Sequence, residues 1–204
     1  MKHYDCIFLD RDGTLNPDPG YISSLDDFTF FDYTLPSLKI MAGAGNRFCI
    51  ITNQSGINRG LIQSDDLDEI HSFIQQEFKK NGIPLLGIYV CTDHPEQATE
   101  RRKPGPGMFL EAEMDHGLTL MDCLMVGDST TDIEAGEMLG MDTMLVLTGR
   151  GAETMNALPD YEMPTYIVED LRKGARKLCD RHGLYEEVPS PRHKEQQEWQ
   201  FGII

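Results

Sequence analysis

The sequence predicts an α/β protein built on a doubly wound parallel sheet. Short apolar runs recur along the 204 residues, and they lie at 6–9, 48–51, 87–91, 123–126 and 143–147. Each run is continuous rather than alternating, which is typical of strands covered on both faces. Amphipathic stretches separate the runs, and this alternation of strand and helix indicates a parallel sheet with helices on its two faces.

Helical patterns fill most of the gaps between the expected strands. The clearest covers 65–80, where apolar residues recur on one face: Leu67, Ile70, Ile74 and Phe78. Ser64 is a typical cap before this helix, and Asn81 and Gly82 form a typical stop after it. Further helices are expected at 34–44, 108–116, 131–139 and 170–181.

The strongly acidic composition disfavours several classes of partner. The formal net charge is -16 at pH 7, whereas proteins that bind nucleic acid or anionic membranes carry basic faces. No apolar run is long enough to span a bilayer, and the N-terminus lacks the apolar stretch of a signal peptide. We therefore expect a cytoplasmic protein with no nucleic-acid or membrane partner. Cys6, Cys49 and Cys123 lie in expected strands, so no disulfide framework is expected.

The last residues, 183–204, differ from the rest of the chain. They are polar and marked by proline until the closing WQFGII, which predicts a C-terminal tail, docked or flexible. Docking on its own domain and contact with a second subunit both stay open. The chain is expected to be a monomer or a weak homo-oligomer.

The first expected strand ends on two acidic residues. Asp10 and Asp12 follow the apolar run 6–9 in the stretch FLDRDGTLN. Two carboxylates so close together repel and raise each other's pKa, which costs stability unless a cation or a reaction uses them. A cation site or a reacting carboxylate is therefore expected here.

Further polar residues follow other expected strands. Thr52 lies in ITNQSG, Lys103 in RRKPGPG, and Asp128 and Asp132 in MVGDSTTD. Each has an ordinary explanation alone, as a turn, a solvated lysine or a helix-capping charge. Together they lie beyond the carboxyl ends of parallel strands, the edge where doubly wound sheets bind ligands.

In this order and placement, the clusters resemble the four motifs of the haloacid dehalogenase (HAD) superfamily of aspartyl phosphotransferases, over about residues 4–182. The resemblance implies a Rossmann-like HAD fold and a phosphatase in which Asp10 attacks phosphorus and becomes an aspartyl phosphate. Asp12 would protonate the leaving oxygen and then deprotonate water, with a pKa raised by its neighbour. Thr52 and Lys103 would hold the transferring oxygens and stabilise their charge.

The resemblance also implies a magnesium cofactor. Asp10, Asp128 and the main-chain carbonyl of Asp12 would bind Mg2+, a hard cation that prefers oxygen ligands. Asp132 would orient the waters on the metal, or Lys103, rather than bind the ion itself.

Many members of the superfamily carry a cap domain inserted after the first or the second motif. The stretches 13–51 and 60–102 each have room only for a loop and one ordinary helix, with a strand in the second. We therefore expect a capless HAD-type phosphatase domain over residues 1–182. Its open site would recognise substrate through the loops at 16–31 and 55–60.

Several segments narrow the resemblance further, namely FLDRDGTLN, GYI, ITNQSGINRG, CTDHP and RRKPGPGM. Together they resemble the D-glycero-D-manno-heptose 1,7-bisphosphate 7-phosphatases and the related histidinol-phosphatase domains. The implied substrate is a small phosphate ester, a heptose bisphosphate or alternatively histidinol phosphate or another sugar phosphate. The implied substrate-binding residues are Asp18, Gly20, Tyr21, Asn53, Gln54, Ser55, Arg59 and Arg102.

The chain departs from that family at a loop that usually binds structural zinc. The family has a Cys-x-His start and a Cys-x-Cys before the third motif, but here only Cys91 remains. Asp93 stands at the His position, and Thr99 and Arg101 stand at the Cys positions. Because structural zinc takes four Cys or His ligands, no structural zinc is expected. Ser129 also stands where the heptose enzymes tend to carry a lysine.

Two other classes of function remain open. A non-catalytic protein that binds a phosphorylated metabolite would share the fold, but keeping so many carboxylates in one place would destabilise it. A nucleic-acid 3'-phosphatase would share the first motif, but the acidic charge balance opposes it. A small-molecule phosphatase is the leading hypothesis.

Overall fold

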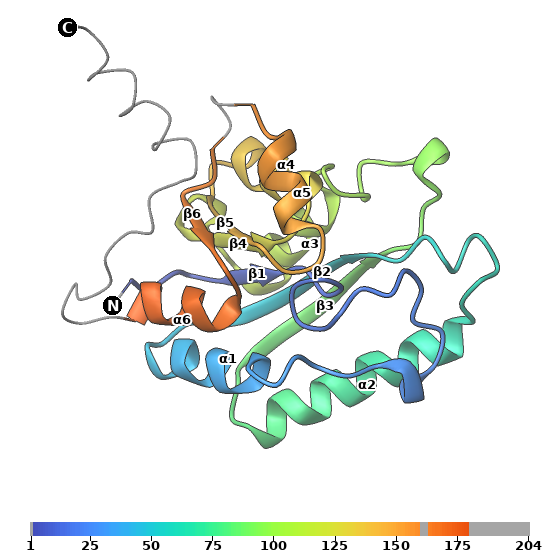
Figure 1. Ribbon diagram of the computed structural model, residues 1–204, viewed down its shortest axis with the longest axis horizontal. Coiled ribbons are helices and arrows are strands. Elements are labelled where there is room, and N and C mark those ends of the chain that lie inside the picture. The colour runs from blue at the N-terminus through green and yellow to red at the C-terminus, as the bar shows by residue number, and fades with distance from the viewer. Residues whose placement is uncertain (1, 160–162, 180–204) are drawn as a thin grey trace, which may run out of the picture.

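The computed structural model describes residues 2–159 and 163–179. Its centre is a six-stranded sheet in the order β3-β2-β1-β4-β5-β6, in which every pairing is parallel (Figure 1). The strands are β1 (Ile7–Leu9), β2 (Phe48–Asn53), β3 (Leu85–Cys91), β4 (Leu124–Gly127), β5 (Asp142–Val146) and β6 (Tyr166–Val168). The chain moves outward from β1 to β3 and then returns beside β1 with β4, so its winding reverses between β1 and β4. Sheets of this kind bind ligands at that reversal, beyond the carboxyl ends of the strands.

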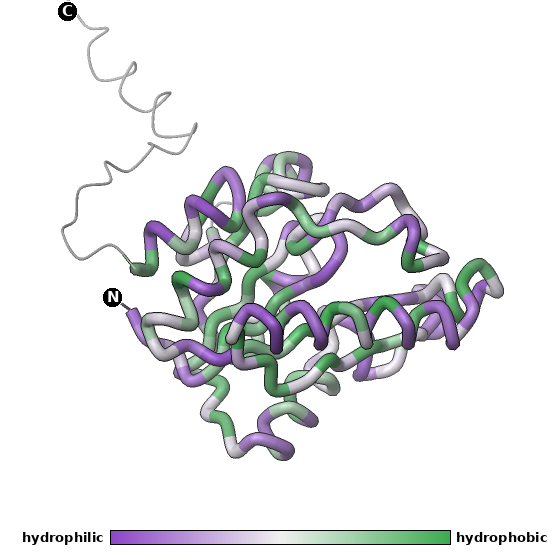
Figure 2. The backbone as a smooth tube through the Cα atoms, turned by 90° about the horizontal axis from the view of Figure 1, so that it is seen from below, coloured by the Kyte–Doolittle hydropathy of each residue, from purple (hydrophilic) through white to green (hydrophobic). Residues whose placement is uncertain are grey.

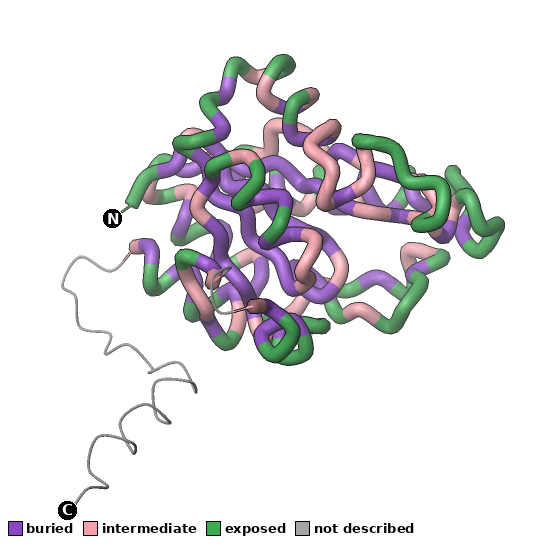
Figure 3. The backbone as a smooth tube through the Cα atoms, turned by 90° about the horizontal axis from the view of Figure 1, so that it is seen from above, coloured by how far each residue is buried: buried purple, intermediate pink, exposed green. Residues whose placement is uncertain are grey.

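In the described part of the chain, three α-helices cover each face of the sheet. One layer holds α1 (Thr34–Gly43), α2 (Ser64–Lys80) and α6 (Leu171–Cys179), and the other holds α3 (Gly107–His116), α4 (Thr130–Met138) and α5 (Gly151–Ala157) (Figure 1). Ile7 and Leu9 pack with the first layer, whereas Phe8 between them packs with the second. Figure 3 shows the resulting band of buried residues through the middle of the molecule. Because both faces are covered, the central strands β1 and β4 are buried along their whole length and lack charged residues. The predicted fold class is confirmed.

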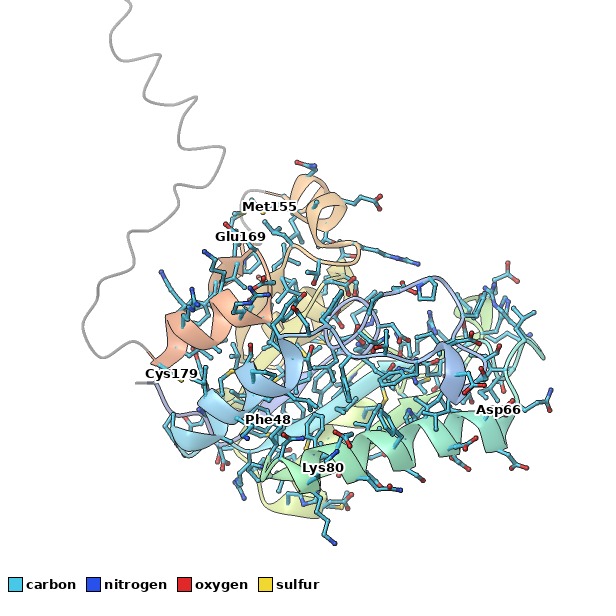
Figure 4. All side chains as sticks on the ribbon, turned by 60° about the horizontal axis from the view of Figure 1, so that its bottom comes forward. Phe48, Asp66, Lys80, Met155, Glu169 and Cys179 are labelled. Carbon is cyan, nitrogen blue, oxygen red and sulfur yellow. The ribbon has the colours of Figure 1, made fainter. Side chains whose placement is uncertain are left out.

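The helix α2 shows how the sequence pattern determines packing. Its buried residues are Leu67, Ile70, His71, Ile74 and Phe78. Hydrophobic and hydrophilic segments alternate along the helices of this face (Figure 2), as expected for a helix that is buried on one side. Asp66 lies in the first turn and Lys80 in the last (Figure 4). A negative charge at the start of a helix and a positive charge at its end both interact favourably with the helix dipole. The cap is Gln63 rather than the expected Ser64, because Ser64 is already the first helical residue.

One α-helix and one strand are not predicted by the sequence pattern. α5 has 7 residues and β6 has 3, and both are too short to reveal a periodicity. β6 pairs along one side with β5 and lies at the end of the strand order. Three short 3-10 helices also escape prediction, namely η1 (Leu25–Asp27), η2 (Pro95–Gln97) and η3 (Leu120–Asp122).

The connections that could carry a cap domain are short. Between β1 and β2 the chain forms only η1 and α1, and between β2 and β3 it forms only α2. All residues of both connections are described, so the predicted capless arrangement is confirmed. The carboxyl edge of the sheet is therefore surrounded by loops.

Three further expectations concern membranes, disulfides and the chain end. Within residues 2–159 and 163–179, no helix combines the length and the apolar character needed to cross a bilayer. All five cysteines are described and free, so the expected lack of disulfides is confirmed. The expected tail, 183–204, lies outside the described residues.

Candidate active site

The residues of the four motifs meet at the carboxyl edge of the sheet. Asp10 follows β1, Thr52 lies near the end of β2, and Asp128 follows β4. Lys103 reaches them from the connection between β3 and α3, and Asp132 from the first turn of α4. All five are buried. Since water is largely excluded, electrostatic interactions between these groups are strong.

Lys103 is the cation at the centre of this cluster. Its Nζ donates to Oδ1 of Asp10 at 2.6 Å, to Oδ1 of Asp132 at 2.6 Å and to the carbonyl of Ile51 at 2.8 Å. Burial alone would lower the pKa of Lys103, but the carboxylates of Asp10 and Asp132 outweigh it and raise that pKa. Lys103 is therefore charged at any physiological pH, with all three ammonium protons directed.

The carboxylates outnumber this cation. Oxygens of Asp10, Asp128 and Asp132 all lie within 4.8 Å of one another. Burial raises the pKa of Asp10 well above its ordinary value against the opposing charge of Lys103, and Asp132 and Asp128 raise it further. Burial and then Asp132 raise the pKa of Asp128 to about 7. A set of oxygen donors with excess negative charge fits Mg2+, which prefers such ligands.

Asp132 is held differently from the other two members of the cluster. Its Oδ2 accepts from the N–H of Ser129 at 3.0 Å and from the Ser129 hydroxyl at 2.6 Å, as in a capping box. Its Oδ1 accepts from Lys103. These three bonds use much of its acceptor capacity, which supports the hypothesis that Asp132 orients Lys103. The Asp12 carbonyl as a metal ligand stays a prediction.

Two glycines leave room for Asp128. Gly13 has a φ of +86°, and a Cβ there would come within 2.1 Å of Asp128 Oδ2. A Cβ on Gly149, whose φ is +53°, would also come within 2.1 Å of that oxygen. The Thr148 hydroxyl donates to the Gly13 carbonyl at 2.6 Å and joins the two loops. Only glycine fits at 13 and 149 while Asp128 keeps this position.

Asp12 is not part of the carboxylate cluster and has its own cation, Arg11. Its two oxygens accept from Nε and Nη2 of Arg11 at 2.9 and 2.8 Å. Burial opposes the charged form of Asp12, but the Arg11 guanidinium outweighs it, and bonds from Asn16 and Gln54 assist, so the pKa of Asp12 is lowered. The expectation that a neighbouring carboxylate raises this pKa is therefore wrong. The intervening arginine decides the sign.

A cavity of about 480 Å³ opens over these groups. Its lining includes most of the predicted substrate-binding residues, namely Asp18, Gly20, Tyr21, Asn53, Gln54, Ser55 and Arg102. Arg59 does not line the cavity, but its Nη1 donates to the Tyr21 hydroxyl at 3.0 Å. The predicted loops thus surround the site, and Arg59 supports one of their side chains.

Several residues of the cavity wall escape the sequence argument. They are Thr130, Thr131, Arg150, Glu153 and Thr154. Arg150 follows β5, and its N–H donates to Asp128 Oδ2 at 2.7 Å. The rule that ligands lie beyond strand ends, applied to the fifth expected strand, would have found it. Arg11 also escapes, because a charged residue beside an apolar strand gives no sign that it is buried.

Hydrogen bonds hold the loop where the family usually binds zinc. Asp93 Oδ2 accepts from the N–H and the hydroxyl of Thr99 at 2.8 and 2.6 Å. Arg101 donates to the Val90 carbonyl at 3.0 Å. The Asp93 carbonyl accepts from Nη1 of Arg102 at 3.1 Å, which fixes that arginine at the cavity. The lack of structural zinc stays a prediction, and these bonds supply an alternative means of holding the loop.

The doubly wound capless sheet and the converging Asp, Thr and Lys side chains define the class of protein, a HAD-type phosphatase. In agreement, residues 100–174 match the HAD-hydrolase-like protein family. The D-glycero-alpha-D-manno-heptose-1,7-bisphosphate 7-phosphatase of Burkholderia mallei is 37% identical over 153 residues, which cover 72% of this chain and 81% of that protein. The D-glycero-beta-D-manno-heptose-1,7-bisphosphate 7-phosphatase of Helicobacter pylori is 40% identical over 137 residues, which cover 67% and 79%.

A solved structure extends this relationship. The D,D-heptose 1,7-bisphosphate phosphatase from B. bronchiseptica, complexed with magnesium and phosphate, superposes with a TM-score of 0.77 at 31% identity. The match covers 85% of this chain and 97% of that one. The chain belongs to the D,D-heptose 1,7-bisphosphate phosphatase family of HAD-like hydrolases, and it is a phosphoric monoester hydrolase.

Proposed function

We propose that this phosphatase hydrolyses a phosphorylated sugar, with a heptose 1,7-bisphosphate as the first candidate, through an aspartyl phosphate on Asp10. The observation that carries the proposal is the meeting of Asp10, Lys103 and Asp128 at the floor of a cavity that Asp12 and Thr52 also line. The relatives named above supply the substrate class.

Mg2+ is the proposed cofactor, and Asp10, Asp128 and the main-chain carbonyl of Asp12 would hold it. When bound, the ion would neutralise charge on the transferring phosphoryl group. It would also keep the Asp10 carboxylate ionised and so able to act as a nucleophile, although burial favours the neutral acid.

Thr52 and Lys103 would bind the oxygens of the phosphoryl group. The Thr52 hydroxyl accepts from Gln54 Nε2 at 2.9 Å, which directs its own O–H elsewhere, toward an incoming acceptor. Lys103 adds a full positive charge that its carboxylate partners maintain. Donors fixed before the reaction stabilise developing charge without having to reorganise.

Asp12 would transfer the protons. Its lowered pKa makes it a carboxylate in the resting protein, the form required to take a proton from water. An incoming phosphate ester brings negative charge next to Asp12 and raises its pKa, which favours the protonated form required for the leaving oxygen.

The cavity wall is suited to a second anionic group. Arg102 and Arg150 both line it, and guanidinium groups bind phosphate oxygens through paired N–H donors. The Burkholderia mallei relative is a phosphatase of the alpha heptose bisphosphate, and the Helicobacter pylori relative is one of the beta form. This chain has Ser129, Asp93, Thr99 and Arg101 at positions where the resemblance implies other residues. The substrate panel therefore contains both anomers.

A panel of phosphate esters tests the proposal directly. It would contain both anomers of heptose 1,7-bisphosphate, histidinol phosphate and simple hexose phosphates, each assayed for phosphate release with and without Mg2+. We expect the highest kcat/KM for a heptose bisphosphate, no turnover without the metal and phosphorus on Asp10 in rapidly quenched enzyme. A preference for histidinol phosphate would move the assignment to that alternative, and turnover without phosphorylation of Asp10 would contradict the mechanism.

A further inference from the structure

Arg11 separates the two carboxylates of the first motif, and its side chain is fully buried. A guanidinium presents two parallel N–H donors that match the two oxygens of a carboxylate. Arg11 uses Nε and Nη2 in this way on its own neighbour, Asp12. A buried charge costs free energy unless it has a counter-ion. The Asp12 carboxylate therefore also offsets the cost of burying Arg11.

The other end of the Arg11 guanidinium is anchored on helix α2. Its Nη1 lies 3.3 Å from Nε2 of His71, and both groups are buried. Arginine only donates, so this ring nitrogen must accept, which requires a neutral imidazole. Burial and then the charge of Arg11 lower the pKa of His71 to about 4, which keeps the ring neutral near pH 7.

Two amides complete the surroundings of Asp12. Asn16 Nδ2 donates to Oδ1 at 2.9 Å, and Gln54 Nε2 donates to Oδ2 at 2.7 Å. Each carboxylate oxygen therefore accepts two N–H groups. Gln54 also donates to the Thr52 hydroxyl, which ties Asp12 to the proposed phosphoryl-binding residue. The Asp12 side chain is 21% exposed and lines the cavity. Proton exchange with substrate therefore requires an amide to give way to it while Arg11 keeps both of its bonds to Asp12.

We propose that Arg11 is a positioning residue that fixes the Asp12 carboxylate for proton transfer, with His71 as its anchor on α2. This inference rests on the proposed function, since Asp12 needs a fixed orientation only if it exchanges protons with substrate and water. Small displacements of a proton-transfer group slow the reaction strongly, and packed partners prevent them.

The bond changes show where Arg11 matters. In the first half-reaction an Asp10 oxygen bonds to phosphorus, the ester P–O bond breaks, and the leaving oxygen takes the proton of Asp12. In the second, a water oxygen bonds to phosphorus, the bond to Asp10 breaks, and Asp12 takes a proton from that water. An alkoxide must be protonated as it leaves, whereas p-nitrophenolate is stable without a proton.

The test compares two esters in Arg11→Lys, a variant that keeps the charge but cannot bond both Asp12 oxygens at once. The measured quantity is kcat/KM, which reports phosphoryl transfer to Asp10 and is independent of the second half-reaction. We expect kcat/KM for the sugar phosphate of the panel that the unaltered protein hydrolyses best to fall about 100-fold and that for p-nitrophenyl phosphate to fall less than about fivefold. Asp12→Asn should show the same selectivity, with a larger loss on the sugar phosphate.

His71 provides a matched pair of variants away from the reacting groups. His71→Gln keeps an acceptor for Arg11, so the ratio of kcat/KM for the two esters should stay close to that of the unaltered protein. His71→Leu removes the acceptor and should reproduce the Arg11→Lys pattern with a smaller loss. This pair also keeps the inference testable if Arg11→Lys fails to fold.

The outcomes separate the inference from the proposed function. Equal losses on both esters, in Arg11→Lys and in His71→Leu, would show a merely structural role and overturn the inference while leaving the phosphatase mechanism standing. An unaltered protein that hydrolyses no sugar phosphate of the panel would overturn the proposed function and the inference together.

Discussion

Asp10 and Asp12 lie two positions apart in one motif, yet their surroundings act on them in opposite directions. Asp10 is buried with Asp128 and Asp132 around a single lysine, and its pKa is raised. Asp12 is paired with an arginine and two amides, and its pKa is lowered. The difference shows that the charge of Asp12 is balanced by Arg11, whereas the carboxylates around Asp10 outnumber Lys103 and carry excess negative charge that a bound cation would neutralise.

The largest expected effect separates the roles of the two carboxylates. Asp10→Asn should lower kcat by roughly a thousandfold or more, because the amide is not a nucleophile. Its stability in Mg2+-free buffer should be unchanged or increased, since the fold favours a neutral group at this position. Activity assays and urea denaturation of the same preparation measure both. A loss of stability in Asp10→Asn would contradict the conclusion that the surroundings of Asp10 favour a neutral group.

Asp12→Asn should have the opposite effect on stability. The substitution leaves the buried Arg11 without its counter-ion, so the free energy of unfolding should fall by about 2 to 3 kcal/mol. Urea denaturation beside Asp10→Asn, which has the same change in charge and shape, provides the matched control. Equal stability of the two variants would show that Arg11 does not distinguish the two carboxylates.

A methyl group introduced next to Asp128 should test whether the position of this carboxylate determines the affinity for Mg2+. In Gly13→Ala the new Cβ would meet Asp128 Oδ2, so Mg2+ affinity should fall about 10- to 100-fold. Gly82→Ala is the control, because its φ of +67° imposes similar backbone strain with nothing within 4 Å of the new Cβ. Isothermal titration with Mg2+ measures both. An equal loss in Gly82→Ala would assign the effect to strain alone.

The smallest expected effect concerns pH. Asp128, with a pKa of about 7, must lose its proton to bind metal, so Mg2+ affinity should fall by up to about tenfold per pH unit below 7. A carboxyl whose folded pKa exceeds its unfolded value favours the folded state when protonated. Its contribution is therefore lost as pH rises from about 4 toward 7. Mg2+ should accordingly raise the melting temperature more at pH 8 than at pH 6, and a pH-independent increase would contradict this.

Much of the fold is predictable because it depends on repeated patterns. The runs that become β1 and β4 are apolar throughout because helices cover both faces, and the stripe of α2 repeats at a helical period. β6 and α5 are missed because 3 and 7 residues are too few for a pattern. The convergence of Asp10 and Asp128 follows from the parallel arrangement, because each comes directly after a strand. Lys103 lies well beyond the end of β3, so its arrival at the site depends on the path of the connection to α3.

The electrostatics of the site are less predictable. Sequence spacing indicates that Asp10 and Asp12 are neighbours, but not that Arg11 turns back to bond Asp12 rather than reaching solvent. Arg150 follows β5, an expected strand after which no site residue is predicted from the sequence. Such features depend on side-chain orientation and burial, which periodicity does not encode.

The two glycines pressed against Asp128 have a consequence for the evolution of this molecule. Neither Gly13 nor Gly149 can be replaced by a residue with a side chain while Asp128 stays in place. Substitutions at these two positions are therefore not neutral. The cavity wall, by contrast, includes loop residues such as Asp18, Tyr21 and Ser55, which come from segments away from these two glycines. New specificities can therefore arise by substitutions in these loops while the residues around Asp128 are inherited intact.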